Sequence, residues 1–94
     1  MIVTGDVRVD LAARQVEVAG VPVELAQKEF DIVRALVERL GSAVRRELLM
    51  DRIWGDARMA VSRTLDVHIS TLRAKLGRPD LIKTLRGFGY RLAQ

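Results

Sequence analysis

The stretch that decides the fold runs from Arg63 to Leu92 and reads RTLDVHISTLRAKLGRPDLIKTLRGFGYRL. Its first half has the apolar spacing of a helix that ends at Gly77, and Pro79 prevents this helix from restarting. Its second half places short apolar runs on both sides of the glycine-rich segment 86–89, which is typical of a β-hairpin. The stretch therefore predicts a helix, from about residue 62 to 76, followed by a basic hairpin.

The predicted helix has two unlike faces. Its apolar positions recur at intervals of four, four, three and four, so they form one buried stripe. The stripe consists of Val61, Leu65, Ile69, Leu72 and Leu76. The opposite face carries Arg63 and the short side chains Val67, Ser70, Thr71 and Ala74. Short chains let a helix enter a major groove, where hydroxyls reach base edges and methyl groups meet thymine. Arg63, Arg73 and Lys75 can hold phosphates. An ordinary amphipathic surface helix is the alternative interpretation.

The segment 81–92 is predicted to be a hairpin wing. One arm contains Ile82, Thr84 and Leu85, and the other contains Tyr90 and Leu92. An arginine at the tip of a glycine-rich hairpin can enter the narrow minor groove, where the potential is most negative. A helix in one groove and an arginine tip in the next is the geometry of a winged helix. Taken alone, such a hairpin is also common in globular proteins without this role.

The first 25 residues predict an antiparallel sheet over 2–25. Valine and leucine alternate with polar residues in three runs, around Val7 to Leu11, Val16 to Val18 and Val21 to Leu25. The pair Ala19 and Gly20 supplies a tight turn between the second and third runs. Strands joined by short turns form an antiparallel sheet with one buried face.

Two further helices are expected between the sheet and the decisive stretch. The first is predicted from about Gln27 to Leu40 and ends at Gly41, and the second from about Arg46 to Trp54 and ends at Gly55. The residues between them, 42–45, allow only a short extended connection. With the last helix they form a three-helix core over 27–77, so the fold class is α+β.

Composition narrows the function classes. Ninety-four residues with 49% apolar side chains make one small folded domain with a single modest core. The chain has no cysteine and one histidine, so we expect no disulfide, metal site or cofactor, and no catalytic triad. No apolar run is long enough for a membrane span, and the N-terminus lacks the pattern of a signal peptide. These features fit a cytoplasmic protein that is not an enzyme.

Charge is distributed unevenly along the chain. Residues 1–60 carry 9 Lys and Arg against 10 Asp and Glu, whereas residues 61–94 carry 7 against 2. The net charge of +4 therefore combines −1 in the first part with +5 in the last third. A neutral body with a basic third indicates phosphate binding on one face, and a solvated basic surface is the alternative.

Together these residues resemble a known family. The segments KEFDIVRALVERLG at 28–41, LLMDRIWG at 48–55, RTLDVHISTLRAKLG at 63–77 and IKTLRGFGYRL at 82–92 resemble the winged-helix effector domain of OmpR/PhoB-family response regulators. The resemblance covers nearly the whole chain, residues 1–94, as one domain: a winged helix-turn-helix with an N-terminal antiparallel sheet, three helices and a C-terminal β-hairpin wing. It implies sequence-specific binding to double-stranded DNA and transcriptional regulation within a two-component system.

The resemblance also implies roles for individual residues. Arg63 and Thr64 would contact backbone phosphates, and His68 and Arg73 would add contacts along the strand. Asp66, Val67 and Thr71 would face base edges in the major groove. Thr84 would reach a phosphate, Arg86 would enter the minor groove, and Gly87 and Tyr90 would shape the wing. His68 has an alternative role as a half-buried residue beside Ile69, and Trp54 is expected to anchor the core. The residues expected to contact DNA from the recognition helix also include Ser70 and Lys75.

Partners follow from the same resemblance. The family implies tandem binding to direct repeats, a monomer in isolation, activation through a receiver domain phosphorylated by a sensor kinase, and contact with RNA polymerase. The polymerase loop would comprise Gly55, Asp56, Ala57, Arg58, Met59, Ala60 and Val61. The receiver domain is absent from this chain, so the chain is expected to be an excised effector domain. A standalone regulator without phosphorylation control, or a protein-interaction module, is the alternative.

Four positions depart from the family pattern. Ala26 stands where a Thr usually caps the first helix, which should cost roughly 1 kcal/mol at the helix start. Arg45 stands where the second helix commonly has Ser or Thr. Ser70 and Thr71 occupy positions that are often basic, so we expect a weaker dependence of DNA affinity on salt.

Overall fold

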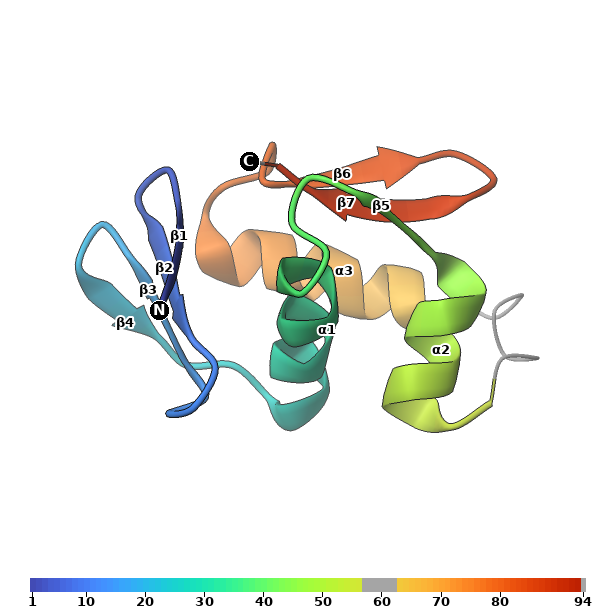
Figure 1. Cartoon of the computed structure of the whole chain (residues 1–94), viewed down its shortest axis with the longest axis horizontal. Helices are drawn as coiled ribbons and strands as arrows, with labels where there is room; N and C mark the ends of the chain where they lie inside the picture. The colour runs from blue at the N-terminus through green and yellow to red at the C-terminus, as the bar shows by residue number, and fades with distance from the viewer. Residues whose placement is uncertain (57–62, 94) are drawn as a thin grey trace.

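The computed structural model describes residues 1–56 and 63–93. Seven strands and three helices follow one another in the described ranges (Figure 1). In chain order they are β1 (Ile2–Thr4), β2 (Val7–Asp10), β3 (Gln15–Val18), β4 (Val21–Val23), α1 (Gln27–Val37), β5 (Ala43–Arg45), α2 (Arg46–Trp54), α3 (Thr64–Leu76), β6 (Ile82–Leu85) and β7 (Gly89–Leu92). The predicted α+β class, with an N-terminal sheet, three helices and a C-terminal hairpin, is confirmed.

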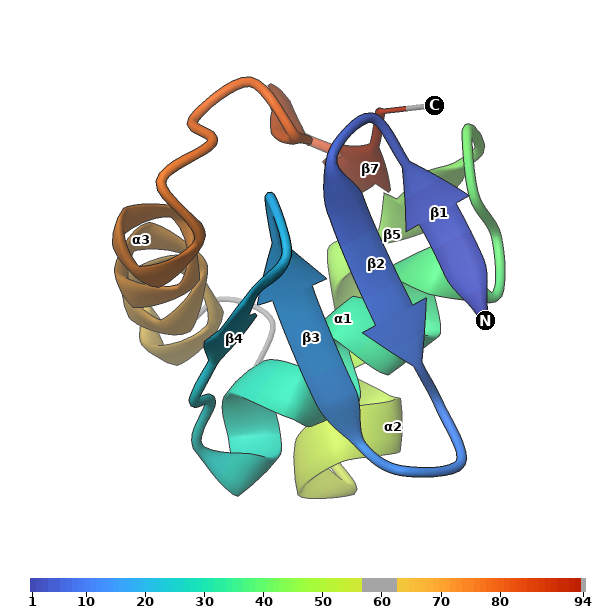
Figure 2. The same ribbon diagram turned by 90° about the vertical axis from the view of Figure 1, so that its left-hand side faces the viewer.

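The N-terminal sheet has the order β1-β2-β3-β4, and every neighbouring pair is antiparallel. Figure 2 looks onto this sheet, with α1 behind it. The buried face carries valines from β2 and β3, as the alternation predicted. Ala19 and Gly20 form the predicted turn, with φ of 51° and 81°. Leu11 lies in a turn beyond the end of β2, yet it still packs against the core.

Helix α1 ends earlier than predicted. Its last helical residue is Val37, and the segment from there to Gly41 forms turns. The amides of Arg39 and Leu40 donate to carbonyls three residues back, at 3.1 Å each. These bonds have the tighter spacing of a 3-10 turn, so the α-helix ends before them. Gly41 has φ of 83°, and its amide donates to the Leu92 carbonyl (3.2 Å). It therefore contacts β7 and does not cap the helix.

Helices α2 and α3 end as predicted. Gly55 and Gly77 are left-handed C-caps, with φ of 75° and 64°, and each amide donates to a carbonyl four residues back. The predicted start of the third helix near Ser62 lies outside the described residues.

The predicted extended connection after α1 is also a strand. β5 pairs with β7, which makes a second sheet of order β5-β7-β6. The wing is therefore a hairpin with a third strand along its edge. This third strand brings the start of α2 to the wing, because the Arg46 amide donates to the Phe88 carbonyl (3.0 Å).

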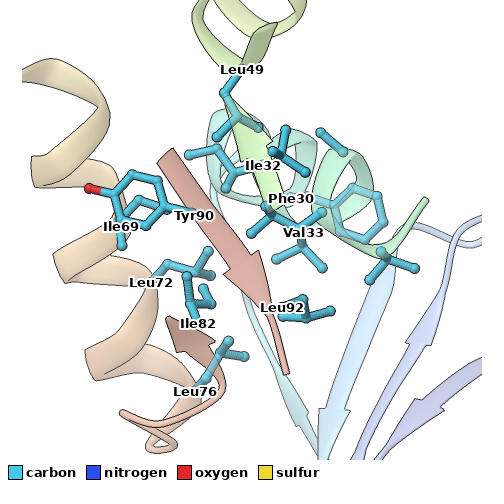
Figure 3. Packing of buried hydrophobic residues seen from close by; sticks show 14 of the residues in the cluster. Phe30, Ile32, Val33, Leu49, Ile69, Leu72, Leu76, Ile82, Tyr90 and Leu92 are labelled. Carbon is cyan, nitrogen blue, oxygen red and sulfur yellow. The ribbon is translucent and has the colours of Figure 1, made fainter. Parts of the chain in front are cut away.

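One core joins these layers. On α3, the described residues of the predicted stripe are all buried, and Val61 lies outside the described residues. Figure 3 shows Ile69, Leu72 and Leu76 of α3 lying toward Ile82 and Tyr90 of the wing. The two ends of the chain also meet, because the Thr4 hydroxyl donates to the Ala93 carbonyl (2.7 Å). No helix in the described ranges combines the length and the apolar character that a membrane crossing needs.

Candidate nucleic-acid interface

The outward face of α3 is exposed and carries short side chains. Val67 is 59% exposed, and Ser70, Thr71 and Ala74 are exposed beside it. The Thr71 hydroxyl donates to the Val67 carbonyl one turn back (3.1 Å), so its oxygen is presented at the surface as an acceptor. These side chains offer methyl groups and hydroxyls, the two kinds of group that read base edges in a major groove.

The Asp66 carboxylate is hydrogen-bonded within the protein, although its side chain is 43% exposed. Its carboxylate accepts two hydrogen bonds from the Arg46 guanidinium, at 2.6 and 3.2 Å, and a third from the Tyr90 hydroxyl. The hydrogen bond from Arg46 holds the pKa of Asp66 below its ordinary value. Partners on α2 and β7 hold this carboxylate within the protein, and its contact with base edges stays a prediction.

Tyr90 belongs to the same contact. Its ring is buried, and burial followed by the hydrogen bond to Asp66 raises the pKa of Tyr90 to about 12. The hydroxyl therefore stays protonated as a donor at neutral pH. The contact joins the wing strand β7 to α3, and the role of Tyr90 in shaping the wing stays a prediction.

Arg73 points toward the wing. Its Nε and Nη2 atoms donate to the Ile82 carbonyl, the former at 3.1 Å, and Nη2 also donates to Thr84 Oγ1 (2.8 Å). The guanidinium carbon lies 5.8 Å from the centre of the Tyr90 ring. These donors join α3 to β6, and the phosphate contact of Arg73 stays a prediction. Thr84 is exposed and accepts from Arg73, so its own proton is directed elsewhere and can be donated to a phosphate.

Lys75 is also engaged within the protein. Its Nζ lies 2.7 Å from Oε1 of Glu29, a carboxylate at the start of α1 that is 4% exposed. Burial alone would raise the pKa of Glu29, but hydrogen bonds from Lys75 and the Ala26 amide outweigh it, so the pKa lies below its ordinary value. The predicted phosphate contact of Lys75 stays a prediction beside this ion pair.

The structure favours the alternative for His68. The residue is half-buried, its Nδ1 lies 2.8 Å from the Thr64 carbonyl oxygen, and its ring meets the Trp54 ring edge-on at 5.1 Å. Since a carbonyl only accepts, Nδ1 carries the proton in this contact. Trp54 packs against the core, as predicted. Thr64, the other predicted phosphate contact at the helix start, is half-buried.

The wing turn is exposed and basic. Arg86 is exposed and Gly87 has φ of 74°, as a tight turn at this position requires. The guanidinium of Arg45 lies 5.2 Å from the ring centre of Phe88, which is 38% exposed. Sequence reasoning missed Arg45, which reaches the wing only because β5 pairs with β7.

The predicted polymerase loop is described only at its start. Gly55 caps α2 and Asp56 is half-buried. The other predicted members, Ala57, Arg58, Met59, Ala60 and Val61, lie outside the described residues.

The candidate interface therefore consists of two parts. The first is the outward face of α3 with Arg63, which is exposed at the start of this helix. The second is the wing turn with Thr84, Arg86 and Arg45. Figure 1 shows the wing turn at the same end of the molecule as the start of α2. Within the described ranges, no group of three or more His, Cys, Asp or Glu side chains could hold a metal ion.

The chain is similar to known proteins along most of its length. The family model described as "Transcriptional regulatory protein, C terminal" matches residues 20–92. The sensory transduction protein RegX3 of Mycolicibacterium smegmatis is 39% identical over 92 residues, which cover 94% of this chain and 40% of RegX3. The response regulator protein PmrA of Pseudomonas aeruginosa is 39% identical over 93 residues, which cover 99% of this chain and 42% of PmrA. The chain thus spans about two fifths of the length of these relatives.

Solved structures share the fold. The DNA-binding domain of RstA from Klebsiella pneumoniae, determined in complex with the RstA box, superposes with a TM-score of 0.88 and 34% identity over 98% of this chain and 95% of that one. The DNA-binding domain of CpxR from E. coli gives a TM-score of 0.87 and 31% identity, over 99% of this chain and 95% of that one. The sheet, the three helices and the wing are thus arranged as in these two DNA-binding domains.

Proposed function

The chain belongs to the OmpR/PhoB-type family of C-terminal domains of transcriptional regulatory proteins, and from this we propose that it binds double-stranded DNA sequence-specifically. In this role it regulates transcription as the effector domain of a two-component response regulator. The observation that carries the proposal is the exposed face of short side chains on α3, beside a wing turn that carries Arg86.

The two parts of the interface divide the work. Val67, Ser70 and Thr71 read base edges, because methyl groups and hydroxyls distinguish base pairs in the major groove. Arg63 and Thr84 position the protein on phosphates. Arg86 enters the minor groove, where its charge meets the most negative potential. Arg45 joins this set as a cation at the wing turn.

Further partners belong to the proposal. Because the relatives are more than twice as long as this chain, we assign a receiver domain and its sensor kinase to the full-length regulator. The loop from Gly55 to Val61 contacts RNA polymerase, and the protein acts in the cytoplasm, where bacterial DNA is found. Residues 1–94 act as one domain that is a monomer in isolation and binds direct repeats in tandem.

Selection of bound duplexes from a random pool, followed by sequencing, tests this function. We expect an enriched direct repeat with half-sites about one helical turn, roughly 10 base pairs, apart. A palindrome would contradict tandem binding. If no duplex were enriched at about 150 mM salt, DNA binding itself would be refuted, and a protein-interaction winged helix would take its place.

Two substitutions separate reading from positioning. Thr71→Ala should change the enriched sequence, because it removes a hydroxyl from the face that reads bases. Arg86→Ala should weaken binding to all sequences about equally, since a minor-groove cation attracts the duplex with little regard to base identity. Selection with each variant measures the first effect, and titration with a fixed duplex set measures the second. An unchanged sequence with Thr71→Ala would refute the assignment of α3 as the reading helix.

A further inference from the structure

A continuous series of polar contacts joins α2, α3 and the wing. Arg46 of α2 donates to Asp66 of α3, which also accepts from the Tyr90 hydroxyl of β7. The Tyr90 ring lies beneath the guanidinium of Arg73, and Arg73 donates to Thr84 and to the backbone of β6. We call these five residues the polar link. Four of them had been predicted from the family resemblance to contact DNA or to shape the wing.

The polar link attaches α3 to the wing at two points. Asp66 and Arg73 are seven residues apart, which is close to two helical turns, so they lie on one face of α3. Their partners Thr84 and Tyr90 are directly opposite each other on β6 and β7, so they lie on one face of the wing. Two attachments along a helix fix both its distance from the wing and its angle to the wing.

Apolar packing alone would fix this angle less well. Leu72, Leu76 and Ile82 are buried between α3 and the wing, but burial of apolar area is not directional. Hydrogen bonds to charged groups are directional and short, and they are stronger than bonds between neutral groups. The connection from Gly77 to Leu81 is a loop, which does not itself fix the angle between α3 and the wing. The hydrogen bonds of the polar link therefore fix this angle.

We propose that Asp66, Tyr90 and Arg73 are positioning residues that hold the reading helix and the wing as one rigid unit. This inference rests on the proposed function. The unit keeps the α3 face in the major groove in fixed register with Arg86 in the minor groove. The energetic consequence is that the two contacts support each other, so Arg86 contributes fully only while the polar link is intact.

A double-mutant cycle between Arg86 and Tyr90 tests the inference. Tyr90→Phe keeps the buried ring and removes only the hydroxyl that donates to Asp66. In the wild-type chain we expect Arg86→Ala to lower affinity about 10-fold, and in the Tyr90→Phe chain only about 3-fold or less. Asp66→Asn should reduce the effect of Arg86→Ala in the same way. If Tyr90→Phe lowers the folded fraction of the protein, Asp66→Asn provides the test in its place. Titrations use the selected duplex and the active protein concentration.

A second measurement addresses register directly. A duplex with one base pair inserted between the positions contacted by α3 and by the wing should bind the wild-type chain much more weakly than the original duplex. The Tyr90→Phe chain should discriminate less between the two, because its wing can follow the displaced groove. Thr4→Val is the matched control, since it also removes one hydroxyl hydrogen bond, to the Ala93 carbonyl outside the polar link, and it should discriminate as the wild type does.

The outcomes separate the two proposals. If the wild type binds the selected duplex, and the Arg86 effect and the insertion penalty are the same in all backgrounds, the positioning role is overturned while the proposed function stands. If the wild type binds no duplex, both are overturned. A smaller Arg86 effect together with a smaller insertion penalty in Tyr90→Phe and Asp66→Asn, but not in Thr4→Val, supports the positioning role.

Discussion

Gly89 pairs with Arg45 where strand β7 runs alongside strand β5. A Cβ atom at this position would lie 2.0 Å from the Val44 carbonyl oxygen and 2.9 Å from the carbonyl carbon, well inside normal contact distances. Gly87, two residues earlier, has open space around it but a φ of 74°. The two wing glycines therefore serve different purposes: one permits a turn and the other permits a close approach.

This difference predicts unequal costs of substitution. Gly89→Ala should lower the free energy of unfolding by about 3 kcal/mol or more, because β5 and β7 must move apart. Gly87→Ala should cost only about 1 to 2 kcal/mol, the strain of a left-handed backbone with a Cβ atom. Denaturant unfolding of the two variants measures both. Equal costs would show that close packing is not the constraint at Gly89.

At the scale of elements, the start of α1 lacks half of a capping arrangement. The Glu29 carboxylate accepts from the Ala26 amide (2.7 Å), which is one of the two reciprocal bonds of a capping box. Ala26 has no side-chain oxygen to supply the other, although its backbone is already extended as an N-cap requires, with φ of −66° and ψ of 160°. The helix is held instead by its apolar face and by the pair of Glu29 with Lys75.

Completing the capping box should stabilise the domain. Ala26→Ser should raise the free energy of unfolding by about 1 kcal/mol, because its hydroxyl can accept from the Glu29 amide without any change in the backbone. Ala12→Ser is the matched control, since it places the same side chain in an exposed turn and should change stability little. Thermal and denaturant unfolding compare the three proteins. A gain in Ala26→Ser no larger than in the control would refute the capping argument.

At the scale of the whole molecule, the basic excess of the last third is partly consumed by internal contacts. Lys75 pairs with Glu29, Arg78 pairs with Asp6, and Arg73 joins the wing. The longest dimension, 37 Å, runs from the N-terminal sheet to the wing turn (Figure 1). Arg63 and Arg86 stay exposed in this third, so fewer of its cations are available to phosphates than its net charge of +5 suggests, and Arg45 from β5 adds one more exposed cation.

The proposed DNA affinity should accordingly respond to an added charge on α3. Ser70→Arg places a cation on the outward face, and each additional phosphate contact should steepen the slope of log affinity against log salt by about 0.9. Ser42→Arg adds the same charge at an exposed turn before β5 and should leave the slope unchanged. Titrations at several salt concentrations measure the slopes. A parallel change in both variants would mean that total charge, and not the face of α3, sets the salt dependence.

Some features of this domain could be inferred without coordinates because they depend on near neighbours in the chain. The period of two in the first strands, the buried stripe of α3 and the glycines that end α2 and α3 are of this kind. Each reflects backbone geometry within a few residues. The exposure of Val67, Ser70 and Thr71 followed from the same helical period.

Other features were decided by packing between distant segments. Asp66 was predicted to read bases, but Arg46 and Tyr90, 20 and 24 residues away, bind its carboxylate. Lys75 meets Glu29 across 46 residues. A helical period shows which face of a helix is polar, but it does not show which polar groups find partners. Those partners exist only once α2, α3 and the wing pack together, because hydrogen bonds act over about 3 Å.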